Sequence, residues 1–446
     1  MTHRATLAPG DATAASARFA RMLPLAFITY SLAYLDRVNI GFGEAGSMSK
    51  SLKLSEAQFA FFNASFFIGY VLFQIPGARY AAQRSVKKLM FWALIFWGII
   101  ASLTAVLQDY KLLLLDRFLL GAVEGVVFPS LLVFLTHWFT KRERSRANTI
   151  LILGNPLTLL LGSLVSGKLV EYFSRHPYFG MQGWQLMLLA EGLPTLGWAA
   201  IWWWLAKDRP SDAPWLGPRE ASTVEEVMES EQRDVRQVKD YRAAFRDRQV
   251  ILLCLQFFAW SVGIYGLNMW LPVIVKQGSN MGIARVGYLN AIPYLFGAIV
   301  MLGISTASDR LLVRKTFVWP FMFLGAAAFL VSYLAGPTHF WIAFGGLILA
   351  ATCMYAPYGP FWAMVPEMVS RNVIGESLAL INTIGAVGGF VGTYGVGLLK
   401  NHTGGYGASF VCLGVSLVMA GLLTTVVRAR PVAPGRGFEV VVREPV

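Results

Sequence analysis

Charged residues are scarce in this chain: Asp, Glu, Lys and Arg make up 14% of its 446 residues, against roughly 25% in an ordinary soluble protein. Cysteine is scarce too. Only Cys254, Cys353 and Cys412 are present, far apart and inside apolar stretches, which argues against a disulfide framework and a thiolate metal site. The chain also has no HExxH, GxSxG or CxxC pattern near the expected membrane boundaries and no GxxxxGK[ST] loop. A membrane enzyme and an ATP-driven pump are therefore disfavoured.

Apolar residues are abundant, at 56% of the chain. Stretches close to 20 residues recur between Met22 and Val427, and about 20 apolar residues suffice to cross a bilayer as a helix. We count about twelve, which predicts an all-α integral membrane protein with twelve transmembrane helices in two six-helix halves. The expected segments are an N-terminal segment at 1–21, the first half at 22–205, a charged linker at 206–247, the second half at 248–427 and a tail at 428–446.

Basic residues alternate between successive loops. Groups such as Arg84, Lys87 and Lys88 precede every second span, while the intervening loops are nearly uncharged. The positive-inside rule therefore predicts that both termini and the linker are cytoplasmic, in a bacterial-type inner membrane. The net charge of +13 is spread over these loops, so nucleic acid is not an expected partner. Within the linker, residues 218–243 are expected to form an amphipathic surface helix.

An internal duplication is indicated by two basic loops six spans apart, at 83–88 and 308–315. Parallel repeats of six helices, with a substrate site near the bilayer midplane between them, are the architecture of the major facilitator superfamily. The chain resembles the anion:cation symporter family within that superfamily, and is most similar to its tartrate and sugar-acid branch. The resemblance is carried by four segments: 34–39 (YLDRVN), Asp116 to Gly125 in span four, 137–144 (HWFTKRER) and 265–272 (YGLNMWLP). One departure is the loop after span two, where Gln83 and Ser85 replace the acid and glycine usual in the family.

Five charges lie inside the predicted spans of the first half: Asp36, Arg37, Asp116, Arg117 and Glu124. A charge at the bilayer centre costs about 2.5 kcal/mol or more, so each needs a partner or a function. Nothing comparable is expected inside the spans of the second half. The cavity should thus have one ionisable wall and one neutral polar wall.

Arg37 and Arg117 are assigned to a substrate carboxylate, because a guanidinium offers a planar fork of donors that matches it. Tyr34 shares a helix stripe with Arg37, three residues apart. Glu124 is the first candidate for proton coupling and Asp36 the second, since a carboxyl group can change its protonation when its surroundings change. The family resemblance implies the same two positions.

Gly121 lies between Arg117 and Glu124 on one face of span four, so it could leave room for a substrate. Alternatively, Gly121 and Gly125 form a close contact between helices.

On the neutral wall, polar side chains could bind substrate hydroxyl groups. These are Tyr265 and Asn268 of span seven, Tyr358 of span ten, Asn382 of span eleven and Asn155 of span five. The resemblance implies a further contact at Tyr70. For each of them, a hydrogen bond between helices is an equally good explanation.

These features together predict a proton-coupled symporter that imports a small organic carboxylate, such as tartrate or galactonate, by alternating access. No cofactor or metal is expected beyond the proton gradient, and a monomer should suffice. An aromatic carboxylate is an alternative substrate. A phosphate-ester antiporter ranks lower, because residues 251–275 of span seven contain no Arg or Lys to hold a dianionic phosphate.

Overall fold

The computed structural model describes residues 9–233, 247–311, 313–369 and 374–428, and every regular element in those ranges is helical. The first half consists of α1 (Pro9–Ala45), α2 (Met48–Ser51), α3 (Glu56–Gln83), α4 (Val86–Leu103), α5 (Tyr110–Gly125), α6 (Val127–Trp138), α7 (Lys141–Arg175) and α8 (Gly183–Leu205). The second half consists of α11 (Arg248–Ser279), α12 (Ile283–Leu311), α13 (Trp319–Ala335), α14 (Phe340–Tyr355), α15 (Tyr358–Met368), α16 (Ile374–Thr403) and α17 (Gly407–Val426).

The count of membrane-crossing helices agrees with the sequence. In the described ranges, 10 helical segments are long and apolar enough to span a bilayer, with α5 joined to α6 and α14 joined to α15. Helices α1 and α8, with 37 and 23 residues, complete the expected twelve. The breaks within the two joined spans are local: α14 ends at Tyr355 and α15 begins at Tyr358, directly after Pro357.

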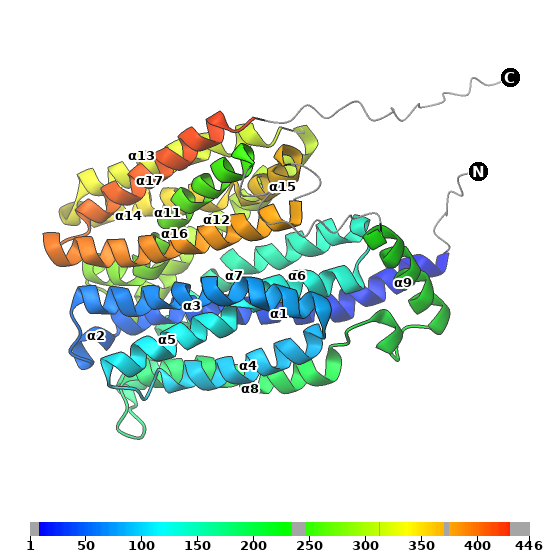
Figure 1. The fold of residues 1–446 in the computed structure, drawn as a ribbon. Coiled ribbons are helices and arrows are strands. Elements are labelled where there is room, and N and C mark those ends of the chain that lie inside the picture. Colours follow the sequence, from blue (N-terminus) through cyan, green and yellow to red (C-terminus); the bar gives the residue numbers. More distant parts are fainter. Residues whose placement is uncertain (1–8, 234–246, 312, 370–373, 429–446) are drawn as a thin grey trace.

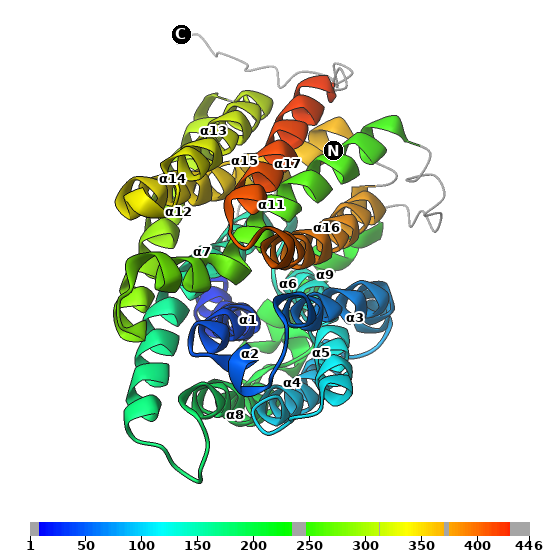
Figure 2. The same cartoon turned by 90° about the vertical axis from the view of Figure 1, so that its left-hand side faces the viewer.

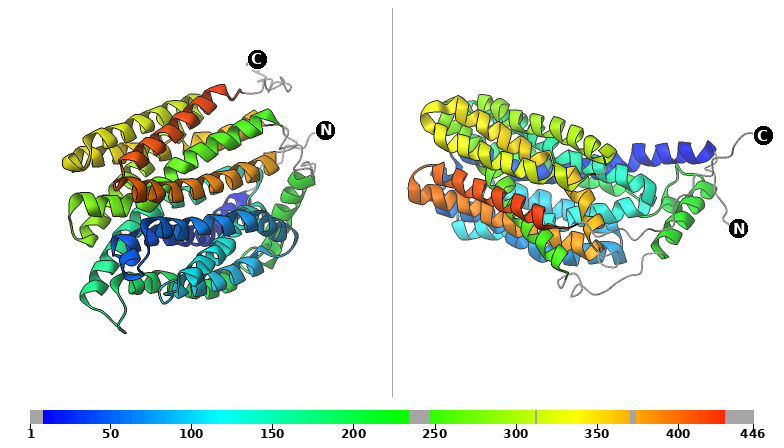
Figure 3. Two further views of the ribbon diagram at one scale, coloured as in Figure 1. Left: turned by 60° about the vertical axis from the view of Figure 1, so that its left-hand side comes forward. Right: turned by 90° about the horizontal axis from the view of Figure 1, so that it is seen from above.

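The helices form two bundles that lie side by side (Figures 1 and 2). The bundles contact each other along α3 and α16, along α7 and α12, and along α1 and α11. One end of the molecule holds the N-terminal end of α1, helix α9 (Pro218–Arg233) and the C-terminal end of α17. Helix α2 lies at the other end (Figure 3). We call these the α9 end and the α2 end.

Glycine residues set the spacing between α3 and α5. A Cβ atom on Gly121 would lie 1.8 Å from the carbonyl oxygen of Phe66, and one on Gly69 would lie 2.0 Å from that of Phe118. Gly125 approaches the Tyr70 carbonyl in the same way, at 2.6 Å. Of the two explanations for Gly121, close helix packing is therefore the one that the structure supports.

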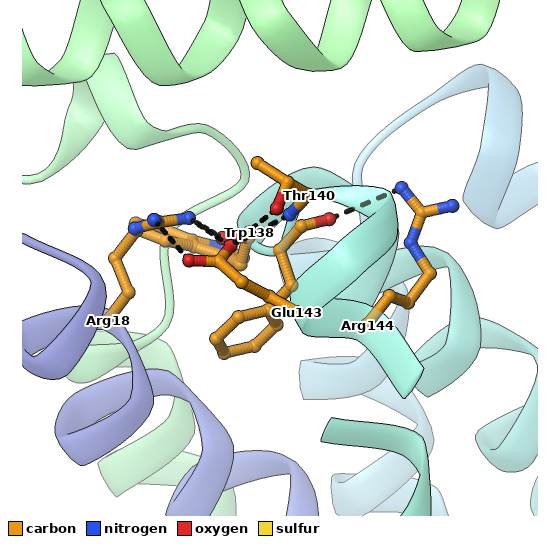
Figure 4. A network of polar contacts seen from close by, with 6 residues as sticks. Arg18, Trp138, Thr140, Glu143 and Arg144 are labelled. Carbon is orange, nitrogen blue, oxygen red and sulfur yellow. Dashed lines mark hydrogen bonds and ion pairs between the residues drawn. The ribbon is translucent and has the colours of Figure 1, made fainter. Parts of the chain in front are cut away.

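The α9 end is tied together by polar contacts from distant parts of the first half. Arg18 of α1 forms an ion pair with Glu143 at 2.9 Å and donates a hydrogen bond to the Trp138 carbonyl at 2.7 Å (Figure 4). Glu143 in turn accepts from the backbone of Thr140 as part of a capping box at the start of α7. These contacts fix α1 against the loop between α6 and α7.

The linker helix α9 packs on this end of the first half. Its Ala221 and Met228 side chains are buried, and Trp215, just before it, stacks on Trp138. Asp208 accepts hydrogen bonds from the Ser85 hydroxyl and the Lys87 backbone, joining the linker to the loop after α3. The helix expected at 218–243 is thus observed over 218–233, while 234–246 and 429–446 lie outside the described residues.

Candidate functional site: a pocket between the two halves

A pocket lies between the two bundles. The first half supplies the side chains of Tyr34, Arg37, Asn63, Phe66, Phe67, Arg117 and Leu159, and the second half supplies Tyr265, Asn268, Met269 and Thr393. Five of the predicted site residues are therefore brought together: Tyr34, Arg37, Arg117, Tyr265 and Asn268. Both cations come from the first half, and the second-half lining is uncharged.

Arg37 is held at the pocket by an acid and by aromatic rings. Its Nε atom lies 3.4 Å from Oε2 of Glu124, whose side chain is fully buried. The guanidinium lies over the ring of Tyr34 at 4.7 Å and over that of Tyr70 at 5.0 Å. Such rings stabilise a cation that has left water. The expected role of Tyr70 as a direct substrate contact stays a prediction, and its observed contact is with Arg37.

Arg117 has fewer partners than Arg37. Its Nη2 atom donates to Oδ1 of Asn63 at a long 3.4 Å, and the guanidinium lies 5.3 Å from the centre of the Phe62 ring. Its Nε atom is buried and has no hydrogen-bond partner in the described part of the chain. A buried guanidinium with unused donors can accept an anion at little rearrangement cost. Asn63 was not singled out from the sequence, although its place on the pocket-facing side of α3 could have been read from helical spacing.

Asp36 faces away from the pocket. It accepts hydrogen bonds from Trp97 Nε1 of α4 and from Asn39 Nδ2, the latter at 2.9 Å. Neighbouring Asp116 accepts from the Thr104 hydroxyl at 2.6 Å. Consecutive residues of an α-helix point in directions about 100° apart, so Asp36 and Arg37 of α1 have different neighbours. Glu124 and Asp36 occupy two separate environments, one at the pocket and one behind it.

Asn268 forms hydrogen bonds with two tyrosines of its own half. Its Nδ2 atom donates to the Tyr355 hydroxyl at 2.8 Å, and its Oδ1 atom accepts from the Tyr294 hydroxyl at 3.3 Å. The amide therefore lines the pocket in an orientation set by α12 and α14. Tyr265 belongs to the second half. Its ring contacts that of Phe67 in the first half, with 5.0 Å between the ring centres.

The remaining predicted residues do not line this pocket. Tyr358 belongs to an aromatic cluster with Trp260 and Trp362, at ring separations of 5.6 and 6.4 Å. Asn382 is half-buried on α16, one position before Thr383, which donates to Gln74 of the first half at 3.0 Å. Asn155 is buried in α7, and its Oδ1 atom has no hydrogen-bond partner. Their part in substrate binding stays a prediction.

Lys400 and Glu191 are among the buried charged residues that the sequence analysis did not identify. Lys400 of α16 is 8% exposed and forms an ion pair with Glu56 of α3 at 2.6 Å. The expectation that no second-half span buries a comparable charge is therefore wrong. Because Lys400 lies near the α2 end and outside the pocket lining, the neutral character of that wall is unchanged. Glu191 of α8 is 5% exposed.

Similarity to known proteins agrees with this architecture. Residues 26–393 match the model of the Major Facilitator Superfamily. A protein of Agrobacterium vitis named "Putative tartrate transporter" is 32% identical over 93% of this chain and 91% of its own length. The "Quinolone resistance transporter" of Acinetobacter baumannii is 30% identical over 92% of this chain and 94% of its own.

Solved structures share the fold at low sequence identity. The inward-open xylose transporter XylE of E. coli superimposes with a TM-score of 0.75 at 15% identity, covering 93% of this chain and 98% of that one. A bacterial homologue of the lysosomal transporter Spinster, inward-facing and occupied, gives a TM-score of 0.73 at 17% identity, covering 91% of this chain and 96% of that one. With its two helical bundles and the pocket between them, the chain belongs to the major facilitator superfamily and is a multi-pass membrane transporter, not an enzyme.

Proposed function

We propose that the protein is a proton-coupled symporter for a small hydroxylated carboxylate, such as tartrate or a sugar acid. The observation that carries the proposal is the contact between Arg37 and Glu124 at the pocket. A substrate carboxylate and the Glu124 carboxylate compete for the same guanidinium. Protonation of Glu124 releases Arg37 for the substrate, so that proton and substrate bind together.

The rest of the pocket supports recognition of a polar anion. Arg117 offers a second fixed cation with an unpartnered Nε atom. Opposite the two arginines, Tyr265, Asn268 and Thr393 supply hydroxyl and amide groups that can pair with substrate hydroxyls. The similarity to the Agrobacterium vitis protein named for tartrate favours this class of substrate.

For orientation, we propose that the α9 end faces the cytoplasm. Most of the basic residues between the spans, Arg84, Lys88 and Arg146 among them, belong to this end, while Lys50 and Lys53 lie at the α2 end. This distribution agrees with the positive-inside rule. Import across a bacterial inner membrane then starts from the α2 end and finishes at the α9 end. One monomer holds the whole pocket, so no second copy is required for transport.

The test combines binding with transport. Tartrate, galactonate and their deoxy analogues are screened for thermal stabilisation of the purified protein, and the best ligand is then supplied to proteoliposomes with an imposed pH gradient. We expect accumulation above equilibrium when the outside is acidic, and its collapse when a protonophore is added. Accumulation that follows a sodium gradient, and is indifferent to pH, would refute proton coupling.

An aromatic carboxylate is the second candidate. The observation that favours it is the number of aromatic side chains around the cations, with Tyr34, Phe66 and Phe67 all in the pocket lining. Benzoate and a hydroxybenzoate in the same screen distinguish the two classes. Stabilisation by these acids at concentrations where tartrate and galactonate have no effect would favour the aromatic substrate.

A further inference from the structure

Glu191 is a buried acid on the far side of α1 from the pocket, and it has no ionic partner among the residues that the structure describes. It is the only ionisable residue of α8, and it is 5% exposed. Helix α8 packs against α1, α4 and α7. From α7, the Ser166 hydroxyl lies 2.7 Å from Oε1 of Glu191, while Oε2 is buried with no hydrogen-bond partner.

No basic side chain of the described residues forms an ion pair that would neutralise an ionised Glu191. Among the described residues, Glu191 takes part in no ion pair. The ionisable residues of α4, Lys87 and Lys88, both lie in its first turn. Lys168 of α7 points elsewhere, with its Nζ atom over the ring of Tyr288 in α12. An unpaired carboxylate in such a place is costly, whereas a protonated carboxyl group is neutral. The Ser166 hydroxyl donates one hydrogen bond to Oε1, and this single bond does not offset the cost of burying a carboxylate charge.

The remaining titratable group near Glu191 is Asp36 of α1, and the two acids lie within electrostatic range of each other. The side-chain amide of Asn39 donates to Asp36 at 2.9 Å and also faces Glu191. Asp36 accepts two hydrogen bonds, from Asn39 and Trp97, one at each oxygen. That arrangement is typical of an ionised carboxylate. These contacts suit a pair that holds one proton, with that proton on Glu191 and the charge on Asp36.

We propose that Glu191 is a second proton-binding site of the transporter, linked to Asp36 through Asn39 and separate from the Arg37–Glu124 contact. Helix α1 carries both Arg37, which faces the pocket, and Asp36, which faces Glu191. A movement of α1 during transport changes the distance between the two acids, and with it the proton affinity of the pair. One proton is taken up from water on one side and returned to water on the other. This inference deepens the proposed function and rests on it.

The first arm of the test measures the proton on Glu191 without any substrate. Infrared spectra of the purified protein are recorded over a pH series for the wild type and for Glu191→Gln. We expect a band from a buried protonated carboxyl group in the wild type at neutral pH, and its absence from the variant. Glu124→Gln serves as a control that removes a different carboxyl group. A Glu191→Gln spectrum identical to that of the wild type would overturn the proposal.

The second arm measures the number of protons carried per substrate. Proteoliposomes receive opposing gradients of pH, voltage and L-tartrate or D-galactonate, and the balance point gives the ratio. For Glu191→Gln we expect binding close to that of the wild type and a ratio lower by one proton. An unchanged ratio overturns the inference alone, whereas a wild type that carries no proton overturns the proposed function as well.

If Glu191→Gln does not fold, Glu191→Asp and Ser166→Ala replace it. Glu191→Asp keeps the acid, so we expect the wild-type ratio. Ser166→Ala removes the contact to Oε1, so we expect the carboxyl band to shift in frequency and to titrate at a different pH. A Ser166→Ala band that matches the wild type in frequency and in titration overturns the proposal.

Discussion

Arg37 of α1 and Glu124 of α5 meet at the pocket between the two bundles, with 3.4 Å between Nε and Oε2. The second carboxylate oxygen of Glu124 is buried and has no hydrogen-bond partner among the described residues, so the contact is a single long hydrogen bond and not a bidentate ion pair. A link of this kind can be exchanged for a substrate carboxylate without the loss of a full buried salt bridge. The proposed coupling depends on this relationship.

Replacing either pocket arginine should weaken binding of every carboxylate. Arg37→Ala and Arg117→Ala each remove a fixed positive charge that water in a closed pocket does not replace, and we expect binding to fall at least about 100-fold, equivalent to about 3 kcal/mol. Calorimetric titration with the best ligand from the screen measures the change. Arg79→Ala, which alters α3 outside the pocket lining, is the control, and near-normal affinity in either pocket variant contradicts the assignment.

The division between a charged and a neutral wall predicts a different response at Asn268. Asn268→Ala leaves the Tyr355 and Tyr294 hydroxyls without this partner, a loss of about 1 to 3 kcal/mol for each buried group. We expect reduced thermal stability and a smaller preference for a hydroxy acid over its deoxy analogue. Competition assays with matched acids measure the preference.

The control for Asn268 is Tyr355→Phe, which removes one hydrogen bond to the amide and leaves the pocket lining in place. Tyr355→Phe should reduce thermal stability and retain most of the preference for a hydroxy acid over its deoxy analogue. Asn382→Ala should also narrow the preference if that residue binds substrate. An equal loss of affinity for both acids in the Asn variants contradicts hydroxyl recognition by the second half.

The ion pair between Glu56 and Lys400 joins the two halves at the α2 end. Its loss should favour opening of the pocket at that end, because the halves then separate at lower cost. With the native cysteines replaced by Ser, a cysteine at Thr393 reports access from that side through its reaction with an impermeant thiol reagent. We expect faster labelling in Lys400→Ala and in Glu56→Gln. The charge swap Glu56→Lys with Lys400→Glu should restore the slow rate, and equal rates in all variants would contradict the role of the pair.

The close approach of α3 and α5 gives a prediction on stability. Gly121→Ala places a methyl group where only 1.8 Å separates it from the Phe66 carbonyl oxygen, so the helices must move apart. We expect a melting temperature several degrees lower. Gly197→Ala in α8 is the matched control, because nothing lies within 4 Å of the added methyl group. A similar effect of both changes would contradict the packing explanation.

The fold was predictable because lipid imposes a strong pattern on the sequence. Stretches of apolar residues mark the spans, and the two basic loops six spans apart indicate the duplicated halves. Arg37, Arg117 and Glu124 could be singled out for a similar reason, since a charge inside a span is rare and conspicuous. Arg37 and Arg117 line the pocket and Glu124 contacts Arg37, while their roles in transport stay predictions.

The neutral residues were harder to place. An Asn or Tyr in a span serves a substrate or a helix contact equally well, and sequence spacing does not tell Asn268, which lines the pocket, from Asn382, which does not. Lys400 and Glu191 escaped attention for other reasons. Lys400 lies near the end of its span, where a charge is ordinary, and Glu191 depends on partners from α1 and α7 that only the folded bundle brings together.

The measurement that tests the account most directly is a comparison of net accumulation and exchange in Glu124→Gln. The amide resembles the protonated acid but cannot release a proton. In proteoliposomes with an acidic exterior, the wild type should concentrate the ligand, while Glu124→Gln should exchange labelled for unlabelled ligand across the membrane without accumulating it. A Glu124→Gln protein that still concentrates the ligand together with a proton flux would contradict the central claim that Glu124 couples the proton to the carboxylate.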